Sequence, residues 1–151
     1  MDKFFVMEQV RISILGFTEY PGPRYIRQDK EGEMHSGEAF YIKVLNGAFK
    51  ECYEAKKQLI LELDGVSGYP SSFLDEAIGE LVYDFSRGIV EKYLDFDTCM
   101  YKKRVKQVKD ETYPQWEMRR LKGEDVVHSP NIDKDIYILN SLGKIEKKHL
   151  L

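Results

Sequence analysis

The sequence predicts an α/β fold in which a small mixed sheet is backed by helices. Residues 9–17 and 58–63 have the apolar patterns of strands, and amphipathic helical patterns cover residues 36–57 and 72–85. Strands that alternate with helices of this length are typical of a sheet with helices packed against it. The order along the chain is therefore strand, helix, strand, helix.

The two predicted strands differ in how deeply they should be buried. Residues 9–17 alternate Val10, Ile12 and Ile14 with polar neighbours, which indicates a half-buried strand. Residues 58–63 are a continuous apolar run that ends at an Asp-Gly turn. Such a run favours a strand that is covered on both faces. We therefore expect the second strand to be the buried one.

Serines precede both predicted helices. Ser36 can cap the first helix, and Ser72 can cap the second, with Asp75 in the third helical position. The apolar residues of each helix recur at three- and four-residue spacing, which gives one apolar face. Each helix can therefore pack its apolar face on the sheet.

The C-terminal third has weaker patterns. Residues 105–108 predict a third core strand or an edge strand protected by lysines. Pro114 at a first turn predicts a short helix that ends at Gly123. Residues 128–133 read as a linker, and apolar residues at three-residue intervals over 136–145 predict a final amphipathic helix.

The chain length sets the domain organisation. With 151 residues, of which 42% are hydrophobic, the chain can bury one sizeable core. We expect one α/β domain over residues 1–125, then a linker and a C-terminal helical tail over 126–151.

Composition limits the classes of partner. The net charge of −3 gives no overall field that attracts nucleic acid or anionic lipid. Cys52 and Cys99 stand alone and are expected to be reduced core thiols. The apolar run at residues 4–7 is too short for a signal peptide or a membrane span, so the expected location is the cytoplasm.

The sequence has no motif of a common enzyme class. The three histidines, His35, His128 and His149, lie outside metal-binding and nucleophile motifs. The glycines form no phosphate-binding loop. We therefore expect no enzyme, no catalytic residue, no metal and no cofactor.

The most informative segment joins the second strand to the second helix. It places Ser71 and Ser72 directly after a buried strand and loop, at the start of a helix. Helix N-terminal amides favour an anion, so a phosphoryl group on Ser72 would gain hydrogen bonds there and change the local charge by about −1.5 to −2. The alternative is that the serines only cap the helix, which contributes about 1 kcal/mol.

Three motifs resemble a STAS-like domain family of unknown function. The longest is Gly68–Leu81 (GYPSSFLDEAIGEL), which resembles the core motif of that family. The loop Pro21–Tyr25 and the helix start Ser36–Phe40 are also similar to it. The resemblance covers roughly residues 9–122. It implies a fold related to the anti-sigma factor antagonists, with a small sheet backed by helices.

In the anti-sigma factor antagonists a partner kinase phosphorylates a serine at a helix N-terminus. Their motif reads Asp-Ser-Ser-Gly, followed by Leu and then Gly. The resemblance places the acceptor on Ser72, with Leu74 and Gly79 matching. Pro70 and Phe73 stand where those proteins have the aspartate and the glycine. The second candidate acceptor is Ser71.

The resemblance implies a regulatory protein–protein interaction module. The expected partner is a protein, either a histidine-kinase-like ATPase or a second copy of this chain, with no membrane or nucleic acid involved. Tyr69, Phe73, Asp75 and Arg24 are the candidate partner-binding residues. The two aromatics serve this role only if they are exposed, and the alternative for both is core packing.

Two further segments have alternative interpretations. Arg24, held by a proline-bounded loop, can pair with a partner phosphate or carboxylate, or it can clamp the loop to the domain through Glu38, which we favour. The basic region 102–120 contains aromatics among its cations, so the alternative function is nucleic-acid binding. Acidic residues in and after this region favour a solvated surface instead.

Overall fold

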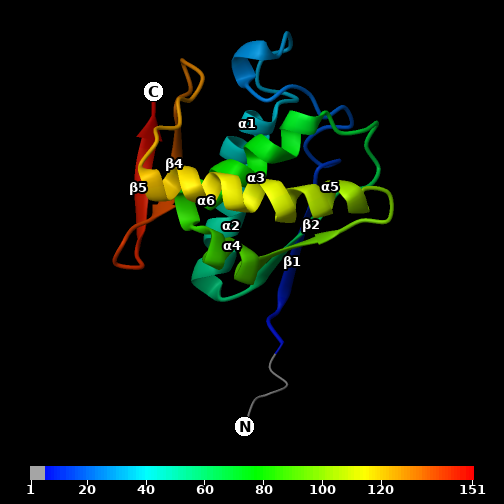
Figure 1. Cartoon of the computed structure of the whole chain (residues 1–151). Helices are drawn as coiled ribbons and strands as arrows, with labels where there is room; N and C mark the ends of the chain where they lie inside the picture. Colours follow the sequence, from blue (N-terminus) through cyan, green and yellow to red (C-terminus); the bar gives the residue numbers. More distant parts are fainter. Residues whose placement is uncertain (1–5) are drawn as a thin grey trace.

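The computed structural model describes residues 6–151, so the start of the apolar run at residues 4–7 lies outside the described residues. The main sheet has three parallel strands in the order β1-β2-β3 (Figure 1). Their bounds are Gln9–Ser13 for β1, Gln58–Glu62 for β2 and Leu94–Asp97 for β3. The α/β fold class is confirmed, and the main sheet is parallel rather than mixed.

The two strands predicted from the sequence are both present. In β2, the three central residues are buried, whereas β1 is largely exposed. β2 lies between the other two strands and is covered by helices, which explains its continuous apolar run. β1 has a neighbour on one side only, and its first three residues are exposed, so the alternation in its sequence is not matched by alternating burial.

The first long helix begins where Ser36 predicts. The Ser36 hydroxyl accepts a hydrogen bond from the Ala39 amide at 3.0 Å. The helix has a π-helical turn in its middle and ends at Lys56, whose φ is 57°. Its parts are α1 (Gly37–Phe40), η2 (Tyr41–Leu45) and α2 (Asn46–Ala55). It connects β1 to β2, as a parallel pair requires.

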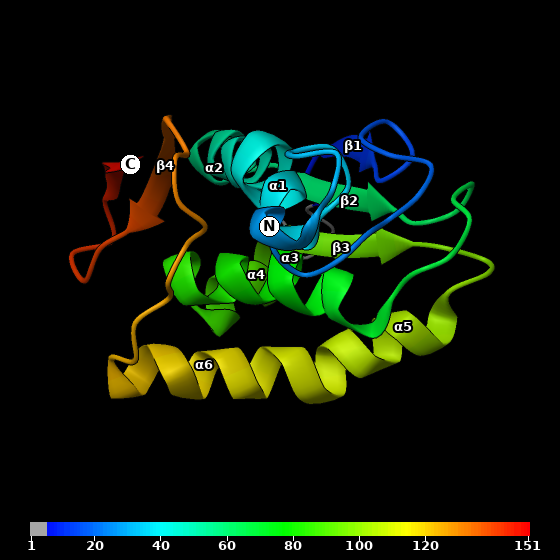
Figure 2. The same cartoon turned by 90° about the horizontal axis from the view of Figure 1, so that it is seen from above.

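The second long helix is the centre of the structure. α3 (Ser71–Phe85) packs against α1, α4 and α6, and against a strand of the C-terminal hairpin (Figure 2). A short helix, α4 (Arg87–Tyr93), follows it and leads directly into β3. Because α3 touches most other elements, few of its positions remain open to solvent.

The prediction of a strand at residues 105–108 is wrong. This segment lies in a long helix made of α5 (Lys102–Gln107), the π-helical turn η3 (Val108–Thr112) and α6 (Tyr113–Lys122). Val108 and Thr112 are both buried on one face of this helix, four residues apart. The predicted strand covered only residues 105–108, which is too short a segment to show this helical spacing. The predicted end at Gly123 is confirmed, with φ of 68°. The third strand is β3, which lies outside the segment predicted as a strand.

The predicted C-terminal helix is also wrong, because residues 134–150 form an antiparallel hairpin. Its strands are β4 (Lys134–Leu139) and β5 (Ile145–Leu150). The amide of Asn140 donates to the Lys144 carbonyl at 2.9 Å, and Gly143 has φ of 77°, so the chain reverses here. Leu142, which completed the helical pattern, lies 80% exposed in this turn. The linker expected at residues 128–133 is confirmed as irregular structure.

The hairpin packs on the rest of the protein. Ile132, Ile136 and Leu150 are buried in the same hydrophobic core as α2 and α3. Asn46 of α2 exchanges two hydrogen bonds with the backbone of Tyr137, at 2.9 and 2.8 Å. Residues 126–151 are therefore a docked part of the structure, at the end of α3 away from Ser71 (Figure 2).

The remaining composition-based expectations have mixed outcomes. Cys52 is buried, as expected, but Cys99 is exposed and is not a core thiol. Within residues 6–151, no helix has both the length and the apolar character needed to cross a membrane.

Candidate functional site

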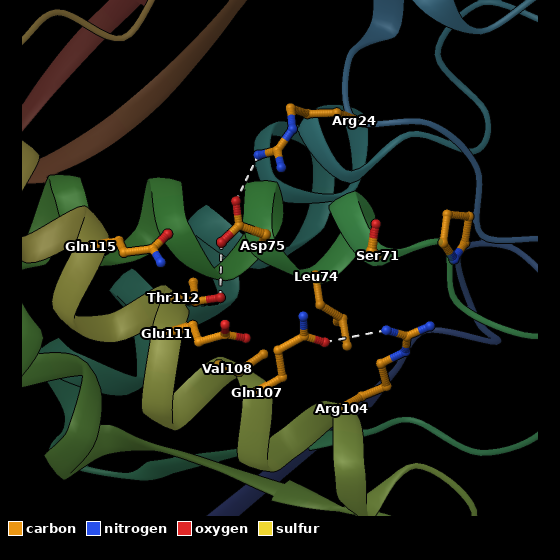
Figure 3. Close-up of a pocket in the computed structure, with 11 residues that line it drawn as sticks. Arg24, Ser71, Leu74, Asp75, Arg104, Gln107, Val108, Glu111, Thr112 and Gln115 are labelled. Carbon is orange, nitrogen blue, oxygen red and sulfur yellow. Dashed lines mark hydrogen bonds and ion pairs between the residues drawn. The ribbon is translucent and has the colours of Figure 1, made fainter.

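A pocket of about 220 Å³ opens beside the first turn of α3 (Figure 3). One wall is α3, with Ser71, Leu74 and Asp75. Arg24 closes it from the loop that follows β1, and the long helix from α5 to α6 forms the opposite wall. The pocket thus lies at the segment that the sequence marked as most informative.

The serine pair is at the first turn of α3, but neither serine caps the helix. Pro70 occupies the N-cap position, and Ser71 and Ser72 are the first two helical residues. The predicted N-cap at Ser72 is therefore wrong. Pro70 has φ of −57° and extended ψ of 147°, so it begins the helix without any side-chain cap.

The two hydroxyls differ in accessibility. Ser71 is exposed and lines the pocket, whereas Ser72 is half-buried. Within residues 6–151, neither hydroxyl has a hydrogen-bond partner, and the start of α3 has no side-chain cap. Both hydroxyls are consequently free of internal partners, and Ser71 is the easier one to reach.

Arg24 forms a clamp, but with a different partner from the one predicted. Its guanidinium donates to Asp75 at 2.8 Å and to Glu76 at 3.0 Å, instead of pairing with Glu38. Partial burial lowers the pKa of Arg24, and the bonds to Asp75 and Glu76 outweigh this and raise it overall. Arg24 therefore holds its loop against α3 rather than against α1.

Glu38 has another role. It is fully buried and accepts hydrogen bonds from the backbone amides of Ile26 and Ser129, both at 2.9 Å. Its backbone amide binds the carbonyl of Arg24 at 3.0 Å, so the two residues do meet, through the main chain. Two segments distant in sequence are thereby fastened to the start of α1.

Asp75 connects three elements in the floor of the pocket. Besides Arg24, it accepts hydrogen bonds from the Thr112 hydroxyl at 2.9 Å and the Trp116 indole at 3.3 Å. These internal bonds orient its carboxylate and leave its side chain 25% exposed. Asp75 is thus part of the framework that joins the Arg24 loop, α3 and α6.

The opposite wall contains a second arginine that the sequence did not connect with the site. Arg104 of α5 donates to the Tyr69 carbonyl at 2.8 Å and to Gln107 at 3.2 Å. In the sequence, Arg104 belongs to a run of basic residues, which predicted only a charged surface. Because α5 was read partly as a strand, the approach of Arg104 to the start of α3 could not be foreseen.

The comparison with family models covers the centre of this arrangement. The model of the STAS-like domain of unknown function (DUF4325) matches residues 36–98. Residues 36–98 are a STAS-like domain. The match is shorter than the expected 9–122, and it includes Ser71 and Ser72 but neither Arg24 nor Arg104. No curated protein and no solved structure matches the chain significantly.

Tyr69 and Phe73 were expected to bind a partner only if they were exposed, and neither is exposed. Phe73 is fully buried and Tyr69 is 6% exposed. The Tyr69 hydroxyl donates to the Leu63 carbonyl at 2.6 Å, and its ring packs edge-on against Tyr101. Both residues are core residues that fix the loop before α3.

The basic region beyond the STAS-like domain lacks exposed stacking groups. Tyr113 and Trp116 are only 2% and 3% exposed, so their rings are not available to bases. Lys106 pairs with Asp110, and Arg120 pairs with Glu117 at 2.7 Å. Nucleic-acid binding by residues 102–120 stays a prediction that rests on exposed lysines alone.

No metal site accompanies the pocket. Among the residues that the structure describes, no group of three or more His, Cys, Asp or Glu side chains is arranged to hold a metal ion. The chemical groups that the pocket offers are a free hydroxyl, two guanidinium groups, two carboxylates and two carboxamides.

Proposed function

We propose that this protein is a regulatory protein–protein interaction module in which the first turn of α3 meets a partner kinase or ATPase. The observation that carries the proposal is the exposed Ser71 hydroxyl at a helix start, beside a pocket that Arg24 and Arg104 border. The likeness to anti-sigma factor antagonists supplies the class of partner, a histidine-kinase-like ATPase. The chain itself is proposed to be the substrate rather than the enzyme.

Phosphorylation of this turn is the proposed switch. The serine oxygen would form a bond to the γ-phosphorus of ATP, ADP would leave, and a base of the partner would take the hydroxyl proton. The resulting phosphoryl group would face the free amides of the first turn of α3, which favour an anion. Its charge of about −1.5 to −2 would turn the mouth of the pocket from mixed to negative.

The two serines are not equivalent in this proposal. The likeness to the antagonist motif favours Ser72, whereas accessibility favours Ser71. Arg24 is already engaged by Asp75 and Glu76, so a phosphoryl group on either serine would have to share it. Arg104 binds only neutral oxygens, and it is therefore the better placed cation for a new negative charge.

Intact-mass measurement tests the switch. The full chain is incubated with ATP and a histidine-kinase-like ATPase encoded close to its gene, and the mass gain is measured for wild type, Ser71→Ala, Ser72→Ala and the double variant. We expect one phosphoryl group on wild type and none on the double variant. Ser67→Ala, an exposed serine in the preceding loop, is the matched control and should gain the same mass as wild type.

Two outcomes would contradict the proposal. In the first, wild type neither gains mass nor binds the ATPase. In the second, the double variant gains as much mass as wild type. Binding without a mass gain would retain the interaction module and remove the phosphorylation switch. The single variants identify which serine is the acceptor.

A further inference from the structure

A row of carboxylates is buried along one side of α3. Glu76, Glu80 and Asp84 are spaced one turn apart, and Glu38 of α1 lies close to the same side. None of the four residues is more than 8% exposed. Four negative charges in so little solvent are costly unless each finds donors or takes up a proton.

In the described part of the chain, three of the four carboxylates have a donor and no buried oxygen that lacks a partner. Glu76 accepts from Arg24 at 3.0 Å, and Glu38 accepts from the amide and hydroxyl of Ser129 and from the Ile26 amide. Asp84 accepts from the Tyr41 hydroxyl. Their burial is thus compensated by hydrogen bonds that the fold supplies.

Glu80 is different. One of its oxygens, Oε1, lies 2.7 Å from Nε2 of His128. The other oxygen, Oε2, is buried, and no donor among the described residues reaches it. Glu80 also interacts with the Glu76 carboxylate one turn earlier on α3. An ionised Glu80 would hold a bare negative oxygen against a second carboxylate.

We propose that Glu80 carries a proton and donates it to Glu76, so that a chain of hydrogen bonds connects His128 with Arg24. In this chain the His128 Nε2 proton goes to Glu80 Oε1, the Glu80 Oε2 proton goes to Glu76, and Glu76 accepts from Arg24. Every buried oxygen of Glu80 is then satisfied. The chain joins the linker before the C-terminal hairpin to the arginine at the candidate site.

The ionisation tendencies agree with this arrangement. Burial, and then the contact with Glu76, raise the pKa of Glu80 well above its ordinary value. Burial also lowers the pKa of His128, so its imidazole is neutral at neutral pH and can donate from Nε2. A neutral acid and a neutral imidazole can share this space without adding to its charge.

The surrounding charges determine the effect of pH. Titratable and charged groups face Glu80 from every element packed against it. They are Glu76, Tyr83 and Asp84 on α3, Glu38 on α1, Tyr41 on η2, His128 in the linker, and Asp125 and Lys148 across the adjoining cavity. Arg24 lies beyond Glu76, with which it pairs. Loss of the Glu80 proton would add a negative charge to a set in which acids already outnumber Arg24 and Lys148. We therefore expect the linker and hairpin to loosen as the pH rises, independently of any phosphorylation.

Carboxyl NMR of the full chain tests the protonation directly. Glutamate is labelled with ¹³C at its carboxyl carbon, and the signal that disappears in Glu80→Gln is assigned to Glu80. Its titration midpoint should lie well above the ordinary value of 4.5. A midpoint close to 4.5 would overturn the proposal. The titration itself is recorded on wild-type protein, and the Glu80→Gln spectrum serves only for the assignment.

Variants of Glu80 test the connection to the hairpin. Glu80→Gln keeps a donor for Glu76 and an acceptor for His128, whereas Glu80→Ala removes both. By hydrogen exchange, the β4 and β5 amides of wild type should lose protection at alkaline pH after correction for intrinsic exchange. The glutamine variant should lose less protection than wild type as the pH rises, because residue 80 can no longer ionise whereas Asp84 still can. The alanine variant should lose protection at every pH.

Glu51→Gln, an exposed glutamate on α2, is the matched control and should behave as wild type. Equal loss of protection in the glutamine and alanine variants would show that Glu80 is needed as a carboxylate, contrary to the proposal. Wild-type protection that does not change with pH would show that the hairpin does not depend on this proton.

Discussion

The two ends of α3 carry polar side chains under opposite conditions. At the start, Ser71 is exposed and Ser72 is half-buried, and their hydroxyls have no internal acceptor or donor in the described structure. Toward the end, Glu80 and Asp84 are buried beneath the linker and hairpin, where only hydrogen bonds and protons can compensate them.

The difference between the two ends shows what decides the availability of a polar group. Water can form hydrogen bonds with the serine hydroxyls, so these hydroxyls need no partner within the protein. The C-terminal hairpin removes solvent from the acids, so these become part of the internal structure. One helix thus carries free hydroxyls at one end and buried acids at the other.

The largest effect is expected from pH acting on the buried end. Burial raises the pKa of Asp84 from 3.8 to about 7. The folded state therefore keeps this proton to higher pH than the unfolded state. The contribution to stability is complete below about pH 4 and is lost as the pH rises through about 7, by at most about 4 kcal/mol because each pKa unit corresponds to about 1.4 kcal/mol.

Urea denaturation of wild type and Asp84→Asn at about pH 5 and about pH 8 measures this contribution. Asparagine cannot ionise, so the variant should lose less stability than wild type between the two conditions. Parallel changes in the two proteins would mean that Asp84 does not titrate in this range.

Substitution at the middle of α3 should have the next largest effect. A Cβ on Gly79 would lie 2.1 Å from the Trp116 ring, so Gly79→Ala forces α3 and α6 apart. We expect a loss of about 3 kcal/mol in the free energy of unfolding. Gly47→Ala, where no atom lies within 4 Å of the new Cβ, should instead be neutral or stabilise its helix by about 0.5–1 kcal/mol. Equal effects of the two variants would contradict the close α3–α6 packing.

Arg24 lies between the two ends, and its replacement should have an intermediate effect. Arg24→Gln leaves the buried Glu76 without its charged partner, which we expect to cost about 2 kcal/mol. Arg27→Gln, an exposed arginine three residues later, should change the stability by less than about 0.5 kcal/mol. Thermal denaturation distinguishes the two variants. Equal stabilities would show that Arg24 does not hold its loop against α3.

The smallest effect is expected at the exposed end. Because neither serine caps α3, Ser71→Ala and Ser72→Ala should each change the stability by less than about 0.5 kcal/mol. Ser36→Ala removes a buried cap and should cost about 1–2 kcal/mol. A loss at Ser71 or Ser72 as large as that at Ser36 would indicate that these serines act as caps after all.

The site could be predicted in part. The Ser71–Ser72 pair after a buried strand was recognisable, because a helical pattern starts there and an apolar run ends a few residues earlier. Arg24 was recognised as a clamp but was assigned to Glu38, since nothing local indicates that α3 lies closer to its guanidinium than Glu38 does. Arg104 was missed because its distance from Ser71 depends on how α5 folds back.

Local periodicity by itself determined the α/β class, the helix start at Ser36, the strand β2 and the position of α3, because each depends on neighbours within a few residues. Tertiary structure decided the rest. The segment 134–150 has spacing that suits a helix, but burial of Ile136 and Leu150 against α2 and α3 requires a hairpin. The partners of Arg24 and the protonation of Glu80 likewise arise from residues brought together across the chain, where burial makes each unpaired charge costly.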